Sequence, residues 1–453
     1  MVFFDPHISQ NMSTLIRKQF LAGLVILALF SCFLSAGTAQ ITPQSEPGDT
    51  GNSVIIFIGD GMGPQQIELG RLVEYGPDGK SALLEFPNEN YIDTYNIDLI
   101  TTDSAAGGTA ISTGVRTKSG HIATSWDGKD LTTILEIAET KNYVTGIVVK
   151  CQLAHATPAA FAAHDEDRGS YVSIAEDMAK SGADLLFGGG KDEKYFGTVI
   201  SSMQANGYDY IINKTQMAAQ TSLPVFGLFE DGNMPKASDY TADMTSPTLL
   251  EMVLKAIELL SGSGKPFFLM VEASAIDWGG HANDADYIAH EVIELERAVK
   301  AVQAMAANQP DWQVLVTADH ETGGLKVRDN TLASPLPSDS DTLKDQINKR
   351  TQRVKEIKTT FSTGGHTSTK VILAGMGPYT DRIASAEHHI DTFSLMRLAI
   401  EGKEGPVGEG WYDGYIPLLY IYIIGGIAAI LVLMGIVVRS EEHTSELQSP
   451  NTI

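Results

Sequence analysis

Short, continuously apolar runs alternate with helical patterns through the middle of this chain of 453 residues. A short continuous apolar run is typical of a strand that is covered on both faces, as in a parallel sheet. These runs cover residues 54–58, 146–149, 185–187, 267–271, 313–317 and 371–374. Helical patterns cover residues 64–75, 132–140, 247–260, 285–307 and 389–400. The alternation predicts an α/β fold, a three-layer α/β/α sandwich around a mostly parallel central sheet.

The segment 328–360 interrupts this alternation with polar residues, a Ser-Pro pair and clusters of lysine and arginine. Such a composition favours a small inserted excursion over a separate core. We therefore expect one domain over residues 51–400, with the excursion inside it. The sequence shows no internal repeat that would favour a repeat architecture.

The chain is strongly acidic, with a formal net charge of −24. Proteins bind the backbone of nucleic acids through a surplus of lysine and arginine, so this charge argues against a nucleic-acid partner. It does not exclude a small phosphate-bearing substrate, because bound divalent metal ions can reverse the local field.

The N-terminal residues have the pattern of a secretory signal peptide. Basic residues at 17–18 precede an apolar run over 20–34, and small residues follow at 37–39. We therefore expect a signal peptide over residues 1–39 that is removed on export. A lipoprotein site at Cys32 is the alternative.

Cysteine is scarce in this sequence. If Cys32 is removed with the signal peptide, Cys151 is the only cysteine that remains. No intramolecular disulfide can then form, so an oxidising compartment is permitted but not exploited.

A second apolar run covers residues 416–438, about the length that crosses a bilayer. Aromatic residues crowd its first half, as they do at membrane interfaces. We expect a linker over 401–415 and a transmembrane helix over 416–438, with a buried core helix as the alternative. The two ends together predict an exported protein on the periplasmic or extracellular face, anchored to the membrane.

Residues 439–453 resemble the translation of a sequencing-library adapter, so we expect the native chain to continue differently after Val438.

Acidic residues follow three of the predicted strands. Asp60 comes after the first run, Glu272 after the run at 267–271, and Asp319 after the run at 313–317. Open α/β sheets place their ligands at the carboxyl ends of the strands. One acid in such a position is more often a helix cap, but three together predict a site for a polyvalent cation.

A run of small residues begins at Thr102 with the sequence Thr-Asp-Ser-Ala-Ala-Gly-Gly-Thr-Ala. At the start of a helix, Ser104 would have an exposed hydroxyl and free backbone amides beside it that favour an anion. Alone, this motif indicates no more than an N-cap by Asp103 or Ser104.

Three histidines stand beside acidic residues or in glycine-rich turns. His281 follows Asp277 by four residues, His320 follows Asp319 directly, and His366 follows a Gly-Gly pair. Neutral imidazoles and carboxylates are good ligands for Zn²⁺, whereas carboxylates with hydroxyls or water suit Mg²⁺. One histidine alone is more often a core residue, but three in such positions predict a metal centre.

Arg168 stands among acidic residues, downstream of His155 and Thr157. It is either part of a surface ion pair, which contributes little to stability, or a planar fork for two phosphate oxygens, which lysine cannot imitate.

In content, order and spacing, these segments resemble the alkaline phosphatase family, over about residues 51–400. The resemblance implies hydrolysis of small phosphate monoesters to an alcohol and inorganic phosphate through a phosphoserine. Ser104 matches the nucleophile of the family, and Arg168 matches the guanidinium that holds the phosphoryl group. The family commonly forms homodimers, but the short excursion leaves room for a monomer.

The resemblance also implies two Zn²⁺ ions and one Mg²⁺ ion. Their matching ligands are Asp277, His281 and His366 for the first zinc, Asp60, Asp319 and His320 for the second, and Asp60, Thr157 and Glu272 for the magnesium.

Three further residues are expected beside these ligands: Asp103, His155 and Trp278. Enterobacterial members have Asp in place of His155 and Lys in place of Trp278, whereas other branches of the family carry the residues found here. His155 adds a nitrogen donor near the magnesium position, which leaves the third metal open between Mg²⁺ and Zn²⁺.

Three alternatives share some of these features. A related phosphodiesterase or sulfatase would share the metal ligands, but Arg168 favours monoesters and the sulfatase signature is absent around Ser104. A non-catalytic surface protein that binds metal or phosphate would be expected to lose ligands, and none is missing. A membrane scaffold would explain the apolar C-terminal run but not the motifs.

Overall fold

The computed structural model describes residues 51–98, 101–330 and 332–402. The strands of its central sheet are β1 (Ser53–Gly59), β2 (Asn88–Ile92), β3 (Val144–Gln152), β4 (Leu185–Gly189), β5 (Asp209–Ile211), β6 (Val225–Leu228), β7 (Phe267–Ala273), β8 (Trp312–Thr317) and β13 (Val371–Met376). They lie in the order β2-β13-β8-β1-β7-β3-β4-β6-β5. Neighbours from β8 to β5 pair in parallel, whereas β13 is antiparallel to both β8 and β2.

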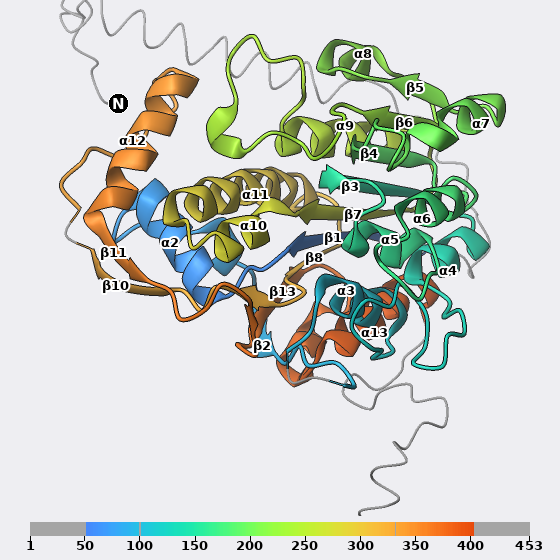
Figure 1. Ribbon diagram of the computed structural model, residues 1–453, viewed down its shortest axis with the longest axis horizontal. Coiled ribbons are helices and arrows are strands. Elements are labelled where there is room, and N and C mark those ends of the chain that lie inside the picture. Colours follow the sequence, from blue (N-terminus) through green and yellow to red (C-terminus); the bar gives the residue numbers. More distant parts are fainter. Residues whose placement is uncertain (1–50, 99–100, 331, 403–453) are drawn as a thin grey trace, which may run out of the picture. The chain divides into compact units, whose positions relative to one another are not determined.

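Helices cover both faces of this sheet (Figure 1). The α-helices are α2 (Pro64–Tyr75), α3 (Ser104–Thr113), α4 (Ile134–Thr140), α5 (Ala156–Ala162), α6 (Tyr171–Met178), α7 (Ile200–Ala205), α8 (Lys214–Ala219), α9 (Leu249–Ser261), α10 (Ala275–His281), α11 (Ala285–Ala306), α12 (Leu343–Glu356) and α13 (His389–Glu401). One layer contains α2, α9 and α11, and the other contains α3, α4, α5 and α13. The predicted three-layer α/β/α sandwich around a mostly parallel sheet is therefore confirmed.

Shorter elements complete the described chain. The 3₁₀ helices are η1 (Ala82–Leu84), η2 (Gly197–Val199), η3 (Ala237–Asp239) and η4 (Thr380–Ser385). Four short strands lie outside the central sheet: β9 (Glu321–Thr322), β10 (Lys326–Asn330), β11 (Ile357–Thr360) and β12 (His366–Thr367). They form two small antiparallel pairs, β10 with β11 and β12 with β9.

The central strands β1, β3, β7 and β8 are buried along their whole length. β3 extends beyond the predicted run at 146–149 because its polar residue Lys150 is also buried. The Lys150 Nζ lies 2.5 Å from Glu294 Oε2 and 3.4 Å from Glu291 Oε2, both on α11. A buried ammonium needs such partners. The sequence pattern could not reveal them, because they are more than a hundred residues away.

Two helices begin later than their apolar patterns predict. Thr133 and Thr248 are the N-caps of α4 and α9, and each forms a capping box with a glutamate three residues on. In this arrangement the threonine side chain binds a backbone amide of the first turn, so its own backbone stays extended. The helices therefore start at Ile134 and Leu249.

The polar segment 328–360 packs against α2 through α12. The Arg353 guanidinium is buried and donates to the carbonyls of Leu72, Val73 and Ser334 at 2.6–2.8 Å. Leu72 and Val73 lie in the last turn of α2, where carbonyls lack partners within the helix. Arg350 adds a bidentate pair with Glu74. The segment thus holds the C-terminal end of α2. The start of α2, at Pro64, lies close to Asp60 in the chain.

The predicted location needs correction. In the part of the chain that the structure describes, no helix is both long enough and apolar enough to cross a membrane. The predicted anchor at 416–438, the linker, the tail and the signal peptide at 1–39 all lie outside the described residues. The exported, membrane-anchored location is therefore not retained.

The contact between α12 and α2 gives a stability prediction. Arg353→Met keeps the apolar stem but removes three charged donors from buried carbonyls. We expect the free energy of unfolding to fall by about 2–4 kcal/mol, because three carbonyls lose a charged donor and only that of Leu72 is known to keep another, the Gly76 amide. Urea denaturation measures this. Lys355→Met, on the exposed face of the same helix, is the matched control and should change stability little. Equal stability of both variants would show that the Arg353 contacts contribute nothing.

Candidate metal centre

Three acidic residues meet at the carboxyl ends of neighbouring parallel strands. Asp60 follows β1, Glu272 lies near the end of β7, and Asp319 comes shortly after β8. β1 lies between β7 and β8, and Ile58 pairs in register with both Glu272 and Thr317. All three acidic side chains are completely buried. The parallel register therefore gathers carboxylates from distant parts of the chain at one edge of the sheet.

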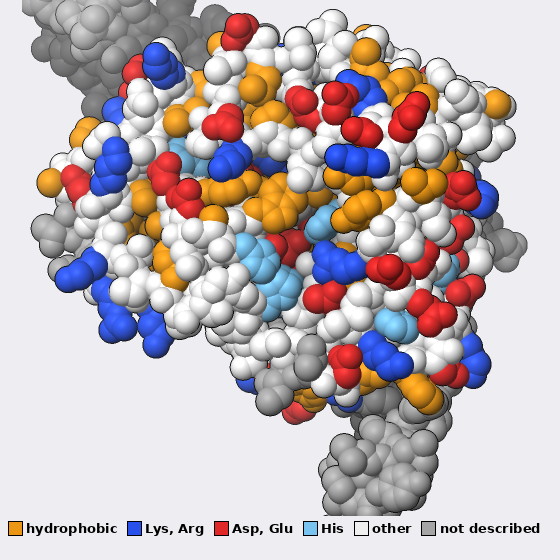
Figure 2. Space-filling model, viewed as in Figure 1, with side chains coloured by type: hydrophobic (Ala, Val, Ile, Leu, Met, Phe, Trp, Pro, Cys, Tyr) orange, Lys and Arg blue, Asp and Glu red, His pale blue; other side chains and the backbone are white. Residues whose placement is uncertain are grey.

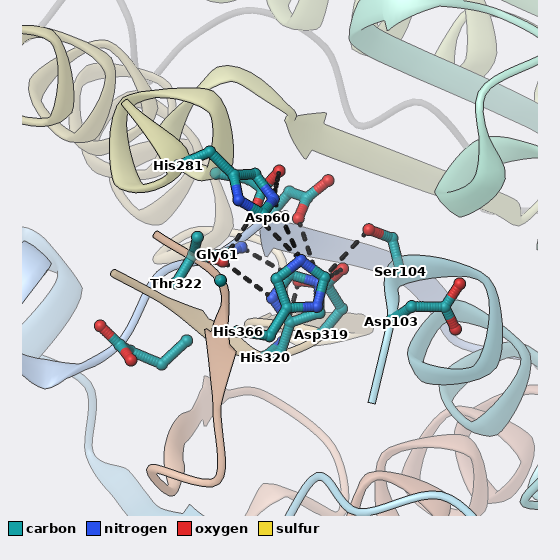
Figure 3. Close-up of polar contacts among 12 residues, drawn as sticks. Asp60, Gly61, Asp103, Ser104, His281, Asp319, His320, Thr322 and His366 are labelled. Carbon is teal, nitrogen blue, oxygen red and sulfur yellow. Dashed lines mark hydrogen bonds and ion pairs between the residues drawn. The ribbon is translucent and has the colours of Figure 1, made fainter. Parts of the chain in front are cut away.

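Asp60, Asp319 and His320 form the inner group of this site (Figure 3). The His320 Nε2 lies 3.2 Å from Asp319 Oδ2 and 3.6 Å from Asp60 Oδ1. Asp319 Oδ1 accepts a hydrogen bond from the Gly61 amide at 3.1 Å. Both oxygens of Asp60 and Oδ2 of Asp319 are buried without a hydrogen-bond partner among the described residues. Buried polar atoms in proteins rarely lack a hydrogen-bond partner. These unpartnered carboxylate oxygens therefore indicate a site for a cation.

His281 and His366 face each other beside Asp277. Nδ1 of His281 lies 2.7 Å from the Gly364 carbonyl, and Nδ1 of His366 lies 2.8 Å from the Thr102 carbonyl. A carbonyl can only accept, so each neutral ring carries its proton on Nδ1 and a lone pair on Nε2. The two Nε2 atoms are 3.2 Å apart, and they lie 3.3 and 3.6 Å from the Asp277 carboxylate. Two lone pairs and a carboxylate at this spacing fit one divalent ion.

Thr322 connects these two groups, and the sequence prediction does not include it. Its Oγ1 donates to Asp277 Oδ1 at 2.5 Å and lies 3.2 Å from Nδ1 of His320. Since the hydroxyl proton goes to Asp277, its oxygen accepts from Nδ1–H of His320, which leaves Nε2 free for the inner group. Thr322 also pairs with His366 where β9 meets β12. No local pattern marks this threonine, because its partners are set by that short strand pair.

Ser104 is the first residue of α3, and it is buried. Its Oγ lies 3.3 Å from Nε2 of His320 (Figure 3). One turn later, a Cβ on Gly107 would lie 3.1 Å from the backbone oxygen of Asp319, so glycine allows the helix to come this close. The helix start therefore brings a hydroxyl and free amides to the acidic group, and such amides favour an anion.

Asp103 is the N-cap of α3 and also binds Arg168. Its Oδ1 accepts from the Ala106 amide at 3.1 Å, while Oδ2 accepts from the Gly120 amide at 3.1 Å and from Arg168 Nη1 at 2.8 Å. Burial acts to raise the pKa of Asp103, but Arg168 and the two amides lower it below its ordinary value. The Arg168 side chain is 30% exposed, and its contact with Asp103 uses Nη1. The arginine is therefore held by a firmly ionised carboxylate, with donors left for a ligand.

A third group lies one strand further along the sheet. It brings Glu272 together with His155, the N-cap of α5, and with Cys151 on β3. Thr157, in the first turn of α5, is completely buried, and its Oγ1 has no partner among the described residues. The Trp278 ring meets the His155 ring edge to face at 6.4 Å. The sequence prediction includes all of these residues except Cys151, which it considers only as a source of disulfides.

Without bound cations, the carboxylates of the site repel one another. Burial raises the pKa of Asp60 well above its ordinary value, and repulsion from Asp319 and Asp277 adds to this effect. Burial also raises the pKa of Asp319 to about 6 and that of Glu272 to about 7. In the protein alone, His281 is protonated on both nitrogens and donates from Nε2 to Asp277, which raises the pKa of His281 to about 9. In Asp277, burial is outweighed by this hydrogen bond and by nearby His320, so its pKa is lowered. A bound cation would displace the Nε2 proton and take the lone pair. Divalent cations would supply the missing positive charge.

Histidine side chains gather near the centre of the face shown in Figure 2, with acidic side chains visible in the hollow beside them. This acidic and imidazole-lined centre, at the carboxyl edge of a parallel sheet and beside a helix start, defines a metal-dependent enzyme of the α/β class.

Comparison with known proteins narrows this class. Residues 51–368 match the family model of alkaline phosphatase. Alkaline phosphatase 3 of Bacillus subtilis is 36% identical over 317 residues, which cover 66% of this chain and 68% of that protein. The cold-active alkaline phosphatase of Shewanella sp. is 31% identical with a TM-score of 0.67, and the match covers 77% of this chain and 99% of that one. A TAB5 alkaline phosphatase variant with Mg bound in its M3 site is 30% identical with a TM-score of 0.66, covering 78% and 99% of the two chains.

The chain belongs to the alkaline phosphatase family. The predictions of the family and of an alkaline phosphatase are confirmed, and so is the dependence on metal. The identity and number of the ions, and the role of each residue, stay predictions.

The position of Thr322 gives a prediction about metal affinity. Thr322→Val keeps the shape of the side chain but removes the hydroxyl that orients Asp277 and His320. We expect zinc to bind about 10–100-fold more weakly, as is typical when a partner of a metal ligand is lost. Competition with a chromophoric chelator measures this.

Thr317→Val is the matched control, because Thr317 is equally buried on β8 and its hydroxyl contacts only a backbone carbonyl. Its zinc affinity should equal that of the unchanged protein. Unaltered affinity in Thr322→Val would mean that the hydroxyl does not support the ligands.

Proposed function

We propose that this chain hydrolyses small phosphate monoesters to an alcohol and inorganic phosphate, with Ser104 as the residue that is phosphorylated. One observation supports this most: a serine hydroxyl lies 3.3 Å from the imidazole of His320, and the neighbouring Asp60 and Asp319 keep three buried oxygens without a hydrogen-bond partner among the described residues. A serine is a weak nucleophile unless its surroundings favour the alkoxide. Here those surroundings are a cation site.

The donor sets fit two zinc ions. Asp277, His281 and His366 would hold one ion, and Asp60, Asp319 and His320 would hold the other. When bound, these ions supply positive charge that favours ionised oxygen atoms of the nucleophile and leaving group. For the third group the family resemblance predicts Mg²⁺ at Asp60, Thr157 and Glu272. That group also contains a thiol, which bears on the choice of ion.

In this proposal, different residues of the chain bind and orient the substrate. The start of α3 presents backbone amides to an anion, and Ser104 stands at that start. Arg168 would bind two phosphoryl oxygens with its planar donors. Asp103 would orient Arg168 through the contact at 2.8 Å. His155 and Trp278 would line the same side of the site.

Partners follow from the same reasoning. The substrates we propose are small phosphate monoesters, and the strongly acidic chain is not expected to bind nucleic acid. A homodimer is the expectation from the family. A phosphodiesterase of the same superfamily and a non-catalytic metal-binding protein are the alternatives that an experiment must separate.

Hydrolysis of p-nitrophenyl phosphate and bis(p-nitrophenyl) phosphate, measured side by side, tests this function. We expect the monoester to react much faster, because in this proposal Arg168 binds two free phosphoryl oxygens, and a diester offers fewer charges. EDTA should abolish the reaction, and Zn²⁺ with Mg²⁺ should restore it. Equal or faster hydrolysis of the diester would favour the phosphodiesterase, and no hydrolysis of either would favour the binding protein.

The nucleophile has a test of its own. Ser104→Ala should lower turnover on the order of 10³-fold or more, because the covalent route is lost. Trapping with ³²P-labelled substrate at acid pH should show no phosphoprotein, while zinc content stays nearly unchanged. Ser112→Ala is the matched control, since Ser112 lies on the same helix and its hydroxyl binds the Ala160 carbonyl away from the acidic groups. Full turnover by Ser104→Ala would overturn the assignment.

A further inference from the structure

The third group of the metal centre contains a donor that oxygen-binding metal sites do not need. Cys151 is buried on β3, next to β7 in the sheet, and its Sγ lies 3.2 Å from Glu272 Oε2. One ligand atom each from Cys151, His155 and Glu272 lies within 4.8 Å of the others. A sulfur, a nitrogen and an oxygen thus converge in one buried place.

Unpartnered atoms in the same place point to a ligand. Glu272 Oε1, Thr157 Oγ1 and His155 Nδ1 are buried, and none has a hydrogen-bond partner among the described residues. Glu272 and Thr157 are completely inaccessible to solvent. Leaving several polar atoms unpaired in a protein interior costs free energy for each atom, so an ion that all of them face would satisfy the group.

A simpler interpretation is that the thiol only holds Glu272 through a hydrogen bond. That interpretation accounts for Glu272 Oε2, which receives the bond. It leaves the second oxygen of Glu272, the hydroxyl of Thr157 and the ring nitrogen of His155 unexplained. A shared ion accounts for all of these atoms together with the thiol.

The donors also select the ion. Mg²⁺ demands oxygen ligands in octahedral geometry and gains little from sulfur or imidazole. Zn²⁺ and related transition ions bind thiolate, imidazole and carboxylate together. We propose that Cys151 is a ligand of the third metal position and that this position takes a thiophilic divalent ion of the Zn²⁺ class in preference to Mg²⁺. The proposal rests on the metal centre proposed above. As the bond from sulfur to metal forms, the thiol gives its proton to solvent.

Cobalt substitution tests the thiolate directly. The full chain is stripped with a chelator and saturated with Co²⁺, and its absorption spectrum is recorded. A thiolate ligand gives an intense charge-transfer band in the near ultraviolet, which carboxylates and imidazoles do not. We expect this band in the unchanged protein, its loss in Cys151→Ser, and its retention in Thr317→Val. Thr317 is the matched control because it is buried on β8, outside the third group, and its hydroxyl contacts a backbone carbonyl.

The outcomes separate clearly. A saturated protein without the band contradicts the proposal, and so does a band that survives in Cys151→Ser, since the signal would then come from Cys32. If Cys151→Ser fails to fold, X-ray absorption of the unchanged zinc protein replaces it. We expect a sulfur neighbour of zinc at about 2.3 Å, and a shell of nitrogen and oxygen alone would overturn the assignment.

Competition between metals tests the preference. After equilibration with zinc and a large excess of Mg²⁺, the unchanged protein should keep about three zinc ions per chain, and Cys151→Ser about two, with Mg²⁺ in the third position. About two zinc ions in the unchanged protein would refute the preference. Phosphomonoesterase activity and the Ser104 phosphoprotein are measured on the same samples. Activity and phosphoprotein formation test the proposed function independently of the metal preference. Intact activity without a sulfur signal would reject only the role of Cys151.

Discussion

The burial of carboxylates at one edge of a parallel sheet is the constraint on which the rest of this structure depends. Asp60, Glu272 and Asp319 are completely buried, and Asp277 nearly so. Such groups cannot stay ionised in a protein interior without a counter-charge. The nearest side chains are mainly imidazoles: burial lowers the pKa of His320 well below its ordinary value and keeps it neutral, whereas the hydrogen bond with Asp277 raises the pKa of His281 to about 9. One imidazolium cannot balance four carboxylates. The fold therefore leaves a deficit of positive charge that divalent ions would supply. Ser104 and Arg168, to which we assign the chemistry, lie beside it.

Part of this site follows from the sequence because it depends on local patterns. Asp60 and Asp319 are visible as acids directly after apolar runs, and parallel strands bring their carboxyl ends together. His281 lies four residues after Asp277, which places both on one helix. For such residues, the order of strands in the sheet is the only further information needed.

Other parts depend on contacts that no local pattern records. His366 reaches the site through the pairing of two-residue strands, β9 and β12, and Thr322 acts there through its partners alone. The extent of β3 depends on Lys150 and its partners on α11. Cys151 lies on the same extension of β3. Because the predicted strand ends at Val149, the sequence prediction does not place this thiol beside the metal centre. The membrane anchor was inferred from composition at the end of the chain, and the structure gives it no support among the described residues.

Asp103 shows why the sequence motif around Ser104 indicates only a helix cap, whereas its contacts in the structure indicate a functional site. One oxygen of this carboxylate caps α3, as the sequence alone indicates, and the other binds Arg168. The cap fixes the direction of the helix start, and therefore the position of Ser104, while the ion pair fixes the arginine relative to the same point. A displacement of either contact would move the serine and the guanidinium apart. The helix cap and the partner of the arginine are thus the same group, because a single half-buried carboxylate sets the distance between the proposed nucleophile and the arginine proposed to bind phosphate.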